Sequence, residues 1–130
     1  WFEQLQASFP SYISYCGLVP FDESTNVLKR YFALLFPTYY DGEGFAGTLI
    51  DAFSAGIPVI ASDWKYNPEI VNEHVGYLYP AKDVAALAAV LKDVSHDPSI
   101  IIEMKKSCLK ESKKYELETV VRDLLNHLKV

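Results

Sequence analysis

The residues best suited to chemistry lie around a loop that carries Gly42, Gly44 and Gly47. Glu43 lies inside this loop, and Asp51 follows Glu43 at a distance of eight positions. A glycine-rich loop that leads into a helix presents free backbone N–H groups, which form a ready site for an anion. Two carboxylates that flank such a site are suited to accept hydrogen bonds from sugar hydroxyls. The stretch therefore predicts a ligand that combines an anionic group with a sugar.

The glycine loop lies between elements that would hold it in place. Residues 32–36 form a short apolar run ahead of the loop, and residues 48–55 have the pattern of a helix that Gly56 ends. Residues 57–61 form a second apolar run, which is typical of a buried strand. The order strand, glycine loop, helix, strand is that of a βαβ unit, in which the loop opens at the start of the helix.

The rest of the chain alternates strand and helix patterns. Further strands are predicted at residues 12–16 and 76–79, and further helices at residues 1–7, 22–31, 69–73, from Asp83 onward, from Pro98 onward and at 117–128. Asp22 or Ser24 would cap the second of these helices, and Asp97 would cap the helix that starts at Pro98. Strands that are near-continuous apolar runs between helices predict the α/β class, with a Rossmann-like parallel sheet covered by helices on both faces. Such sheets bind ligands outside the carboxyl ends of their strands.

The last predicted helix has a wide apolar face, made of Leu117, Val120, Val121, Leu124, Leu125 and Leu128. Two interpretations stay open. The face packs on this domain, or it lacks its partner in this chain and leaves apolar area exposed.

Composition narrows the class of protein. A chain of 130 residues is expected to form one domain, and 50% hydrophobic residues indicate a globular fold. The net charge of −5 argues against a nucleic-acid partner, which would require lysines and arginines that neutralise phosphates. The lysines of residues 105–114 are interrupted by glutamates, so they are interpreted as a solvated helix face, with a membrane-surface patch as the alternative.

Cellular location is addressed only indirectly by the sequence. No apolar run approaches the ~20 residues that span a bilayer, and no signal-peptide pattern is visible. Cys16 and Cys108 are predicted to be free, buried thiols of a cytoplasmic protein. Because the chain begins with Trp1 in a helix-like segment, we expect it to be a piece of a longer protein.

The string EGFAGTLIDAFSAGIPVIASD, residues 43–63, resembles the donor-binding signature of retaining GT-B glycosyltransferases, family 4 (group 1). The resemblance extends more loosely over residues 12–91. It implies that residues 1–130 are part of the C-terminal donor-binding domain, and that the N-terminal acceptor domain is absent from this chain. The full protein would transfer a sugar from UDP-sugar or GDP-sugar to an acceptor hydroxyl with retention, as in polysaccharide biosynthesis.

The resemblance also implies which partners the full protein has. It needs no cofactor and no metal at the active site. The acceptor would be a glycan or a lipid-linked sugar, bound through the missing domain. The protein would be cytoplasmic, with peripheral association at the inner face of the membrane as a further option.

The family's functional residues match particular positions of this sequence. Glu43 aligns with the first carboxylate, a catalytic-site group that touches hydroxyls of the donor sugar. Asp51 aligns with the second carboxylate, which grips the ribose diol, and Val19 lies where the nucleobase packs. The backbone donors to the sugar and diphosphate would be Gly44, Phe45, Ala46, Gly47 and Thr48.

Two positions depart from the family pattern. Asp51 stands where glutamate is usual, and its side chain is shorter by roughly 1.5 Å, so the ribose contact would need a shifted helix or a bridging water. Ala46 stands where the family tends to have glycine.

Purely structural interpretations stand beside these roles. The glycines would permit a tight turn, the two carboxylates would compensate a helix dipole, and Val19 would be a core residue. His74, His96 and His127 lack ligand spacing and are predicted to be surface histidines.

Some groups that the family uses do not occur here. The family holds the diphosphate with an arginine and a lysine upstream of this chain, so the chain alone should bind a donor weakly and transfer nothing. The alternative is a non-catalytic Rossmann-like nucleotide-binding domain, or a receiver-like signalling domain with Asp63 as the phosphorylated residue. A receiver also needs an acidic pair after its first strand and a lysine after its last, and Tyr15-Cys16-Gly17 and Tyr77-Leu78-Tyr79 supply neither.

Overall fold

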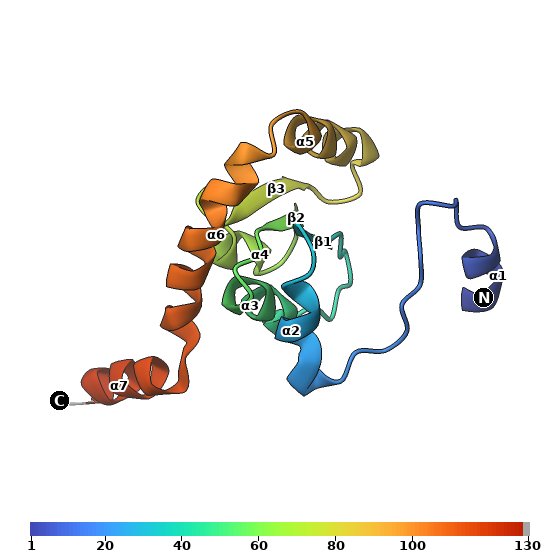
Figure 1. Cartoon of the computed structure of the whole chain (residues 1–130). Coiled ribbons are helices and arrows are strands. Elements are labelled where there is room, and N and C mark those ends of the chain that lie inside the picture. Colours follow the sequence, from blue (N-terminus) through green and yellow to red (C-terminus); the bar gives the residue numbers. More distant parts are fainter. Residues whose placement is uncertain (129–130) are drawn as a thin grey trace.

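A three-stranded parallel sheet forms the centre of the molecule, which we describe from a computed structural model over residues 1–128 (Figure 1). The strands are β1 (Leu34–Phe36), β2 (Val59–Asp63) and β3 (Gly76–Pro80), in the spatial order β1-β2-β3. Leu34 pairs with Val59, and Val59 pairs with Gly76. All three strands therefore end at the same edge of the sheet, where loops from each can meet.

Helices cover both faces of the sheet. The helices are α1 (Phe2–Ala7), α2 (Ser24–Leu28), α3 (Gly47–Ser54), α4 (Asn67–Ile70), α5 (Val84–His96), α6 (Ser99–Ser112) and α7 (Leu117–Leu128), with short 3-10 turns η1 (Phe21–Glu23) and η2 (Lys113–Tyr115). Val59 and Ala61 of β2 pack in one apolar cluster with α3 and α4, whereas Ile60 packs in a second cluster with α5. Because successive side chains of a strand alternate between faces, this division means that β2 is buried on both sides.

Two glycines show how tightly the centre is built. Gly56 ends α3 with a φ of +69°, a conformation that costs glycine little. A β-carbon on Gly76 would lie 2.0 Å from the carbonyl oxygen of Val59 on the paired strand. No side chain fits at that position.

The predicted strand at residues 12–16 is wrong. This segment pairs with no strand in the described part of the chain, and Tyr12 is 85% exposed. In Figure 1 it follows α1 as an extended stretch set apart from the sheet. A largely apolar segment becomes a strand only where a neighbouring strand pairs with it through hydrogen bonds, and no described strand pairs with this one. Cys16 is accordingly exposed, which corrects its prediction as a buried thiol, whereas Cys108 is buried as predicted.

Helix boundaries differ from prediction by a few residues. α2 ends at Leu28, and α4 covers Asn67–Ile70. Neither Asp22 nor Ser24 caps α2, which has Glu23 at its N-cap and no side-chain cap bond. Pro98 takes the N-cap position of α6, and Asp97 Oδ1 accepts a hydrogen bond from the backbone N–H of Ser99.

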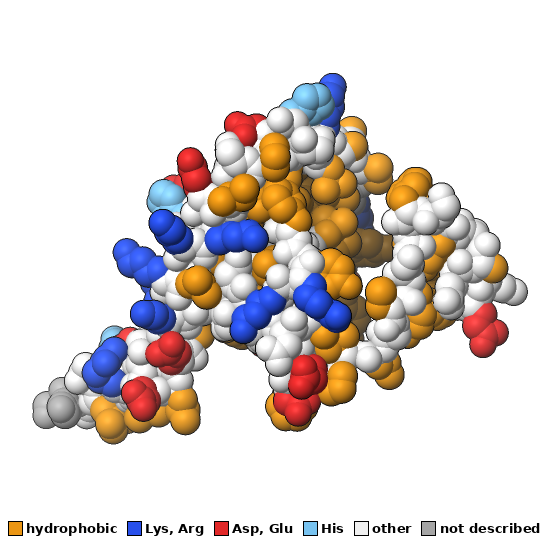
Figure 2. Space-filling model, viewed as in Figure 1, with side chains coloured by type: hydrophobic (Ala, Val, Ile, Leu, Met, Phe, Trp, Pro, Cys, Tyr) orange, Lys and Arg blue, Asp and Glu red, His pale blue; other side chains and the backbone are white. Residues whose placement is uncertain are grey.

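The apolar face of α7 stays exposed, so of the two interpretations only the unpartnered one holds. α7 has no buried residue, and Leu124 is 57% exposed. The helix projects from the end of α6 (Figure 1), and hydrophobic side chains gather along its lower side in Figure 2. Among the described residues, no helix is both long and apolar enough to cross a membrane.

Candidate functional site

The glycine loop leads into α3 with its backbone open. Gly44 and Gly47 have φ values outside the left-handed region, and an added β-carbon at either would meet no atom within 4 Å. The chain itself therefore does not require glycine at these two positions, and at Gly42 an added β-carbon would lie 2.7 Å from the ring of Tyr40, an exposed side chain that can move aside. The N-cap of α3 is Ala46, and no side chain caps the helix. The first turn of α3 thus presents backbone donors that a ligand can approach closely.

Three residues of this loop lie in different environments: Phe45, Ala46 and Thr48. Ala46 is 5% exposed, and its methyl group belongs to the apolar cluster under α3, which accounts for alanine in place of glycine. Phe45 is 60% exposed, and its ring centroid lies 5.6 Å from that of Tyr115. Thr48 is exposed in the first turn of the helix.

Glu43 is held by a chain of hydrogen bonds that begins at the end of β2. The hydroxyl of Thr38 donates to Glu43 Oε2 at 2.9 Å, and the hydroxyl of Ser62 donates to the carbonyl of Thr38. Asn67 in turn donates through Nδ2 to the carbonyl of Ser62 at 3.0 Å. Ser62 and Asn67 are each 1% exposed, so the half-buried Glu43 carboxylate is connected to a rigid interior.

Three residues of this chain of hydrogen bonds were not predicted from the sequence: Thr38, Ser62 and Asn67. Their places in the chain could have indicated a role, because Thr38 follows β1, Ser62 lies near the end of β2 and Asn67 begins the next helix. Oδ1 of Asn67 is buried and has no hydrogen-bond partner in the described residues.

Asp51 is tied to α2. Its Oδ2 accepts a hydrogen bond of 2.7 Å from the hydroxyl of Ser24, and the side chain is half-buried. α3 has no acidic residue in its first turn, so Asp51 lies beyond the part of the helix where dipole compensation is strong. A helix-dipole role therefore does not account for this aspartate.

Val19 lies in a surface cavity and not in the core. It is 43% exposed and lines a cavity of about 500 Å³ together with Val27 and Arg30. Since α2 carries both Val27 and Ser24, this one helix connects the Val19 cavity to Asp51. The structure thus brings Asp51 and Val19 to α2, and Glu43 to the ends of β1 and β2.

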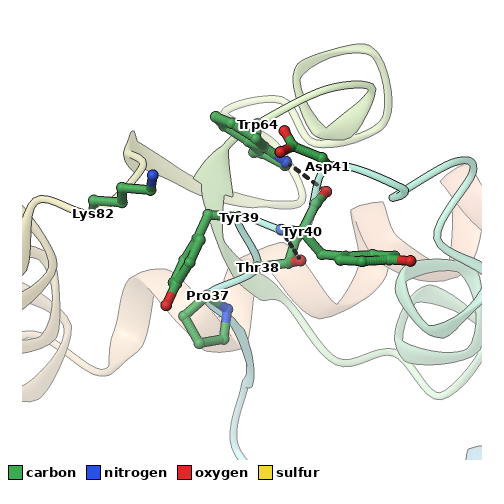
Figure 3. Close-up of a pocket in the computed structure, with 7 residues that line it drawn as sticks. All are labelled: Pro37, Thr38, Tyr39, Tyr40, Asp41, Trp64 and Lys82. Atoms are coloured by element: carbon green, nitrogen blue, oxygen red, sulfur yellow. Dashed lines mark hydrogen bonds between the residues drawn. The ribbon is translucent and has the colours of Figure 1, made fainter.

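A second cavity opens at the carboxyl ends of all three strands (Figure 3). It has a volume of about 540 Å³ and is lined by Pro37, Thr38, Tyr39, Tyr40, Asp41, Trp64 and Lys82. We call it the aromatic pocket. Thr38 belongs both to this pocket and to the hydrogen-bond chain that holds Glu43, so the two sites adjoin.

The side chains with altered pKa values lie outside the predicted donor-binding residues. Burial raises the pKa of Cys108 to about 12, and burial also raises the pKa of Tyr79 and of Tyr115. A hydrogen bond to Glu111 raises the pKa of Lys114. Within residues 1–128 no three histidine, cysteine or acidic side chains are grouped as metal ligands, and His74, His96 and His127 are all exposed.

Comparison with known proteins now assigns the chain to a class. Residues 13–115 match the family model "Glycosyl transferases group 1", and the chain belongs to this family. The structure superposes on sucrose-phosphate synthase from Thermosynechococcus elongatus with a TM-score of 0.74 and 20% identity, over 97% of this chain and 34% of that one. The fold is accordingly that of part of a GT-B glycosyltransferase, as predicted, and the family membership argues against a receiver domain.

Two curated relatives are similar over much of the chain. The O-antigen chain mannosyltransferase B of Escherichia coli is 27% identical over 120 residues, which are 92% of this chain and 30% of that protein. The amylovoran biosynthesis glycosyltransferase AmsK of Erwinia amylovora is 33% identical over 91 residues, which are 66% of this chain and 22% of that protein. The chain thus spans less than a third of the length of these relatives.

Proposed function

We propose that residues 1–130 form the nucleotide-sugar-binding part of a retaining glycosyltransferase of family 4. The full protein would transfer a sugar from UDP-sugar or GDP-sugar to an acceptor hydroxyl. The observation that carries this proposal is the open backbone at Gly44 and Gly47, at the start of α3. Glycine that the chain does not need for its own conformation is expected where a ligand approaches the backbone closely.

Each candidate residue has a role in this proposal. The amides of residues 44–48 donate to the diphosphate and the sugar, and the field at the start of α3 favours their negative charge. Asp51 accepts from the ribose diol, and the Val19 cavity receives the base. The position of α2 supports these two roles, because its Ser24 donates to Asp51 and its Val27 lines the Val19 cavity. Glu43 accepts from hydroxyls of the donor sugar near the reacting carbon.

Other parts of the function would come from outside this chain. An N-terminal acceptor domain would bind a glycan or lipid-linked sugar, and upstream cations would stabilise the departing diphosphate. We propose that catalysis needs no metal or other cofactor and that the fragment alone is inactive. The setting would be polysaccharide biosynthesis in the cytoplasm, with peripheral contact at the membrane.

Calorimetric titration of the full-length protein with UDP and with GDP tests the nucleotide assignment. We expect one of the two to bind, and Asp51→Ala to weaken that binding by at least about tenfold, equivalent to roughly 1.4 kcal/mol. A charge-assisted hydrogen bond to the ribose is strong enough to account for this loss.

Ser24→Ala is the matched control. It removes the protein hydrogen bond to Asp51 and keeps the carboxylate. Affinity close to wild type in Ser24→Ala, with a large loss in Asp51→Ala, would assign the effect to the ligand contact. Equal affinity of wild type and Asp51→Ala would overturn the ribose assignment.

A further inference from the structure

The aromatic pocket is assembled from three separate loops. Residues 37–41 follow β1, Trp64 follows β2 and Lys82 follows β3. Ligands of parallel α/β sheets bind at this edge, outside the carboxyl ends of the strands. The volume of about 540 Å³ is within the range of small-molecule sites. Position and size together therefore suit a small ligand.

The pocket presents aromatic surface in a fixed orientation. Tyr39 is 59% exposed, and Trp64 is half-buried. The indole N–H of Trp64 donates to the carbonyl of Tyr40 at 2.8 Å, which holds the ring in place across the two loops (Figure 3). Aromatic faces carry negative partial charge and attract the positive edges of apolar groups. The C–H face of a sugar ring is such a group, whereas its hydroxyls suit a polar rim.

A lysine lies over these rings. Lys82 Nζ is 5.1 Å from the ring centroid of Tyr39 and 6.0 Å from that of Trp64. Within residues 1–128, no carboxylate oxygen lies within 4.0 Å of this ammonium group. Lys65, by contrast, is 5.3 Å from the Trp64 ring and is paired with Asp41 Oδ1 at 3.8 Å. Lys82 is therefore the cation at this pocket that is available to an anionic ligand.

The backbone beside the pocket is strained. Lys65 has a φ of 50° and Lys82 a φ of 67°, and in the described chain these are the only residues other than glycine with positive φ. The left-handed conformation is costly for side chains of this size and tends to occur at functional sites. Both strained lysines adjoin Trp64. The strained backbone therefore indicates a functional site without relying on the shape of the pocket.

We propose that the aromatic pocket is a saccharide subsite that binds a sugar ring of the acceptor. The ring would pack on Tyr39 and Trp64, with a negatively charged substituent, phosphate or carboxylate, beside Lys82. This assignment to the acceptor rests on the proposed function, because Thr38 connects the pocket to Glu43 and so places it next to the donor sugar.

The test uses the full-length protein labelled with 5-fluorotryptophan, in which loss of a resonance in Trp64→Phe assigns the ¹⁹F signal of Trp64. The probes are mannose 1-phosphate, glucuronic acid, methyl α-mannoside and inorganic phosphate. We expect saturable shifts of the Trp64 signal with the three sugars. Tyr39→Ala should weaken all three about five- to tenfold. Lys82→Met should weaken the two charged sugars by a similar factor and leave methyl α-mannoside within about twofold.

Further variants separate this proposal from the nucleotide site. Tyr12→Ala, at a tyrosine that is 85% exposed and does not line the pocket, is the matched control and should change none of these shifts. Asp51→Ala should weaken UDP or GDP binding and leave the Trp64 shifts unchanged, whereas Tyr39→Ala should weaken the sugar-induced shifts and leave nucleotide binding unchanged. An unmoved Trp64 signal with every sugar would overturn the subsite, as would an equal shift with inorganic phosphate alone. Failure of nucleotide binding with intact Trp64 shifts would overturn the proposed function instead.

Discussion

The central unit of this chain, residues 24–112, and its two flanks, residues 1–23 and 113–128, have similar apolar patterns but opposite burial. α6 in the central unit buries Ile101, Met104 and Cys108. α7 in the C-terminal flank has six apolar residues on one face, and none of them is buried. The flank at the N-terminus likewise exposes Trp1 at 89% and Tyr12 at 85%. Amphipathic pattern alone therefore does not decide burial.

The difference lies in what each face meets. α6 packs on α3 and on the residues around β2 and β3, so its apolar side chains leave water. The flanks meet no comparable surface, and Figure 2 shows hydrophobic side chains open along them. The superposition on sucrose-phosphate synthase covers 97% of this chain but only 34% of that larger one. The proposed acceptor domain and upstream part of the protein are what these faces would pack against.

The largest difference in folding stability is expected between alanine substitutions at two glycines. Gly76→Ala should prevent folding, because the β-carbon would lie 2.0 Å from the backbone oxygen of Val59 and neither strand can retreat without breaking the sheet. Gly44→Ala has open space, so its free energy of unfolding should stay within about 0.5 kcal/mol of wild type. Circular dichroism and urea denaturation measure both. A cooperative transition of Gly76→Ala near that of wild type would contradict the packing of β2 on β3.

A smaller difference in folding stability is expected between alanine substitutions at two apolar side chains. Phe53→Ala removes a side chain that is 0% exposed and should lower the free energy of unfolding by about 3–5 kcal/mol. Leu124→Ala, at a residue that is 57% exposed, should change it by less than about 0.5 kcal/mol in this chain. Urea denaturation with a common slope tests the pair. Similar losses in the two variants would mean that α7 is packed after all.

A third difference, in the rate of alkylation, should distinguish the two cysteines. Burial raises the pKa of Cys108 from 9.0 to about 12, and its thiol lies 3.7 Å from the carbonyl of Val75. Iodoacetamide at pH 8 should therefore modify the exposed Cys16 and leave Cys108 unmodified until the chain unfolds, because the thiolate is the reactive form. Mass spectrometry of the digested protein identifies the modified residue.

The same pKa predicts a loss of stability at high pH. The unfolded chain releases the Cys108 proton above about pH 9, whereas the folded chain retains it up to about pH 12. Between these values the unfolded state is favoured by about 1.4 kcal/mol per pH unit. Cys108→Ala should flatten this part of the profile, and an unchanged slope would contradict the burial of the thiol.

Much of the fold was predictable because it depends on local sequence. The apolar runs at residues 32–36, 57–61 and 76–79 agree with β1, β2 and β3 to within two residues at each end. They were predictable because each run is short and bounded by turn residues. The position of the glycine loop before α3 was predictable for the same reason. The strand at residues 12–16 was not, because a strand also needs hydrogen-bond partners that no local pattern reveals.

The sequence by itself determined where the glycine loop, Glu43 and Asp51 lie along the chain, because their types and spacing are local properties. Only the tertiary structure decided what these groups touch. The contact of Asp51 with Ser24 joins residues 27 positions apart, and Trp64 meets Tyr40 across 24 positions. The aromatic pocket exists because three parallel strands end at one edge and bring three loops together there. Such contacts depend on the packing of distant segments, which spacing along the chain does not encode.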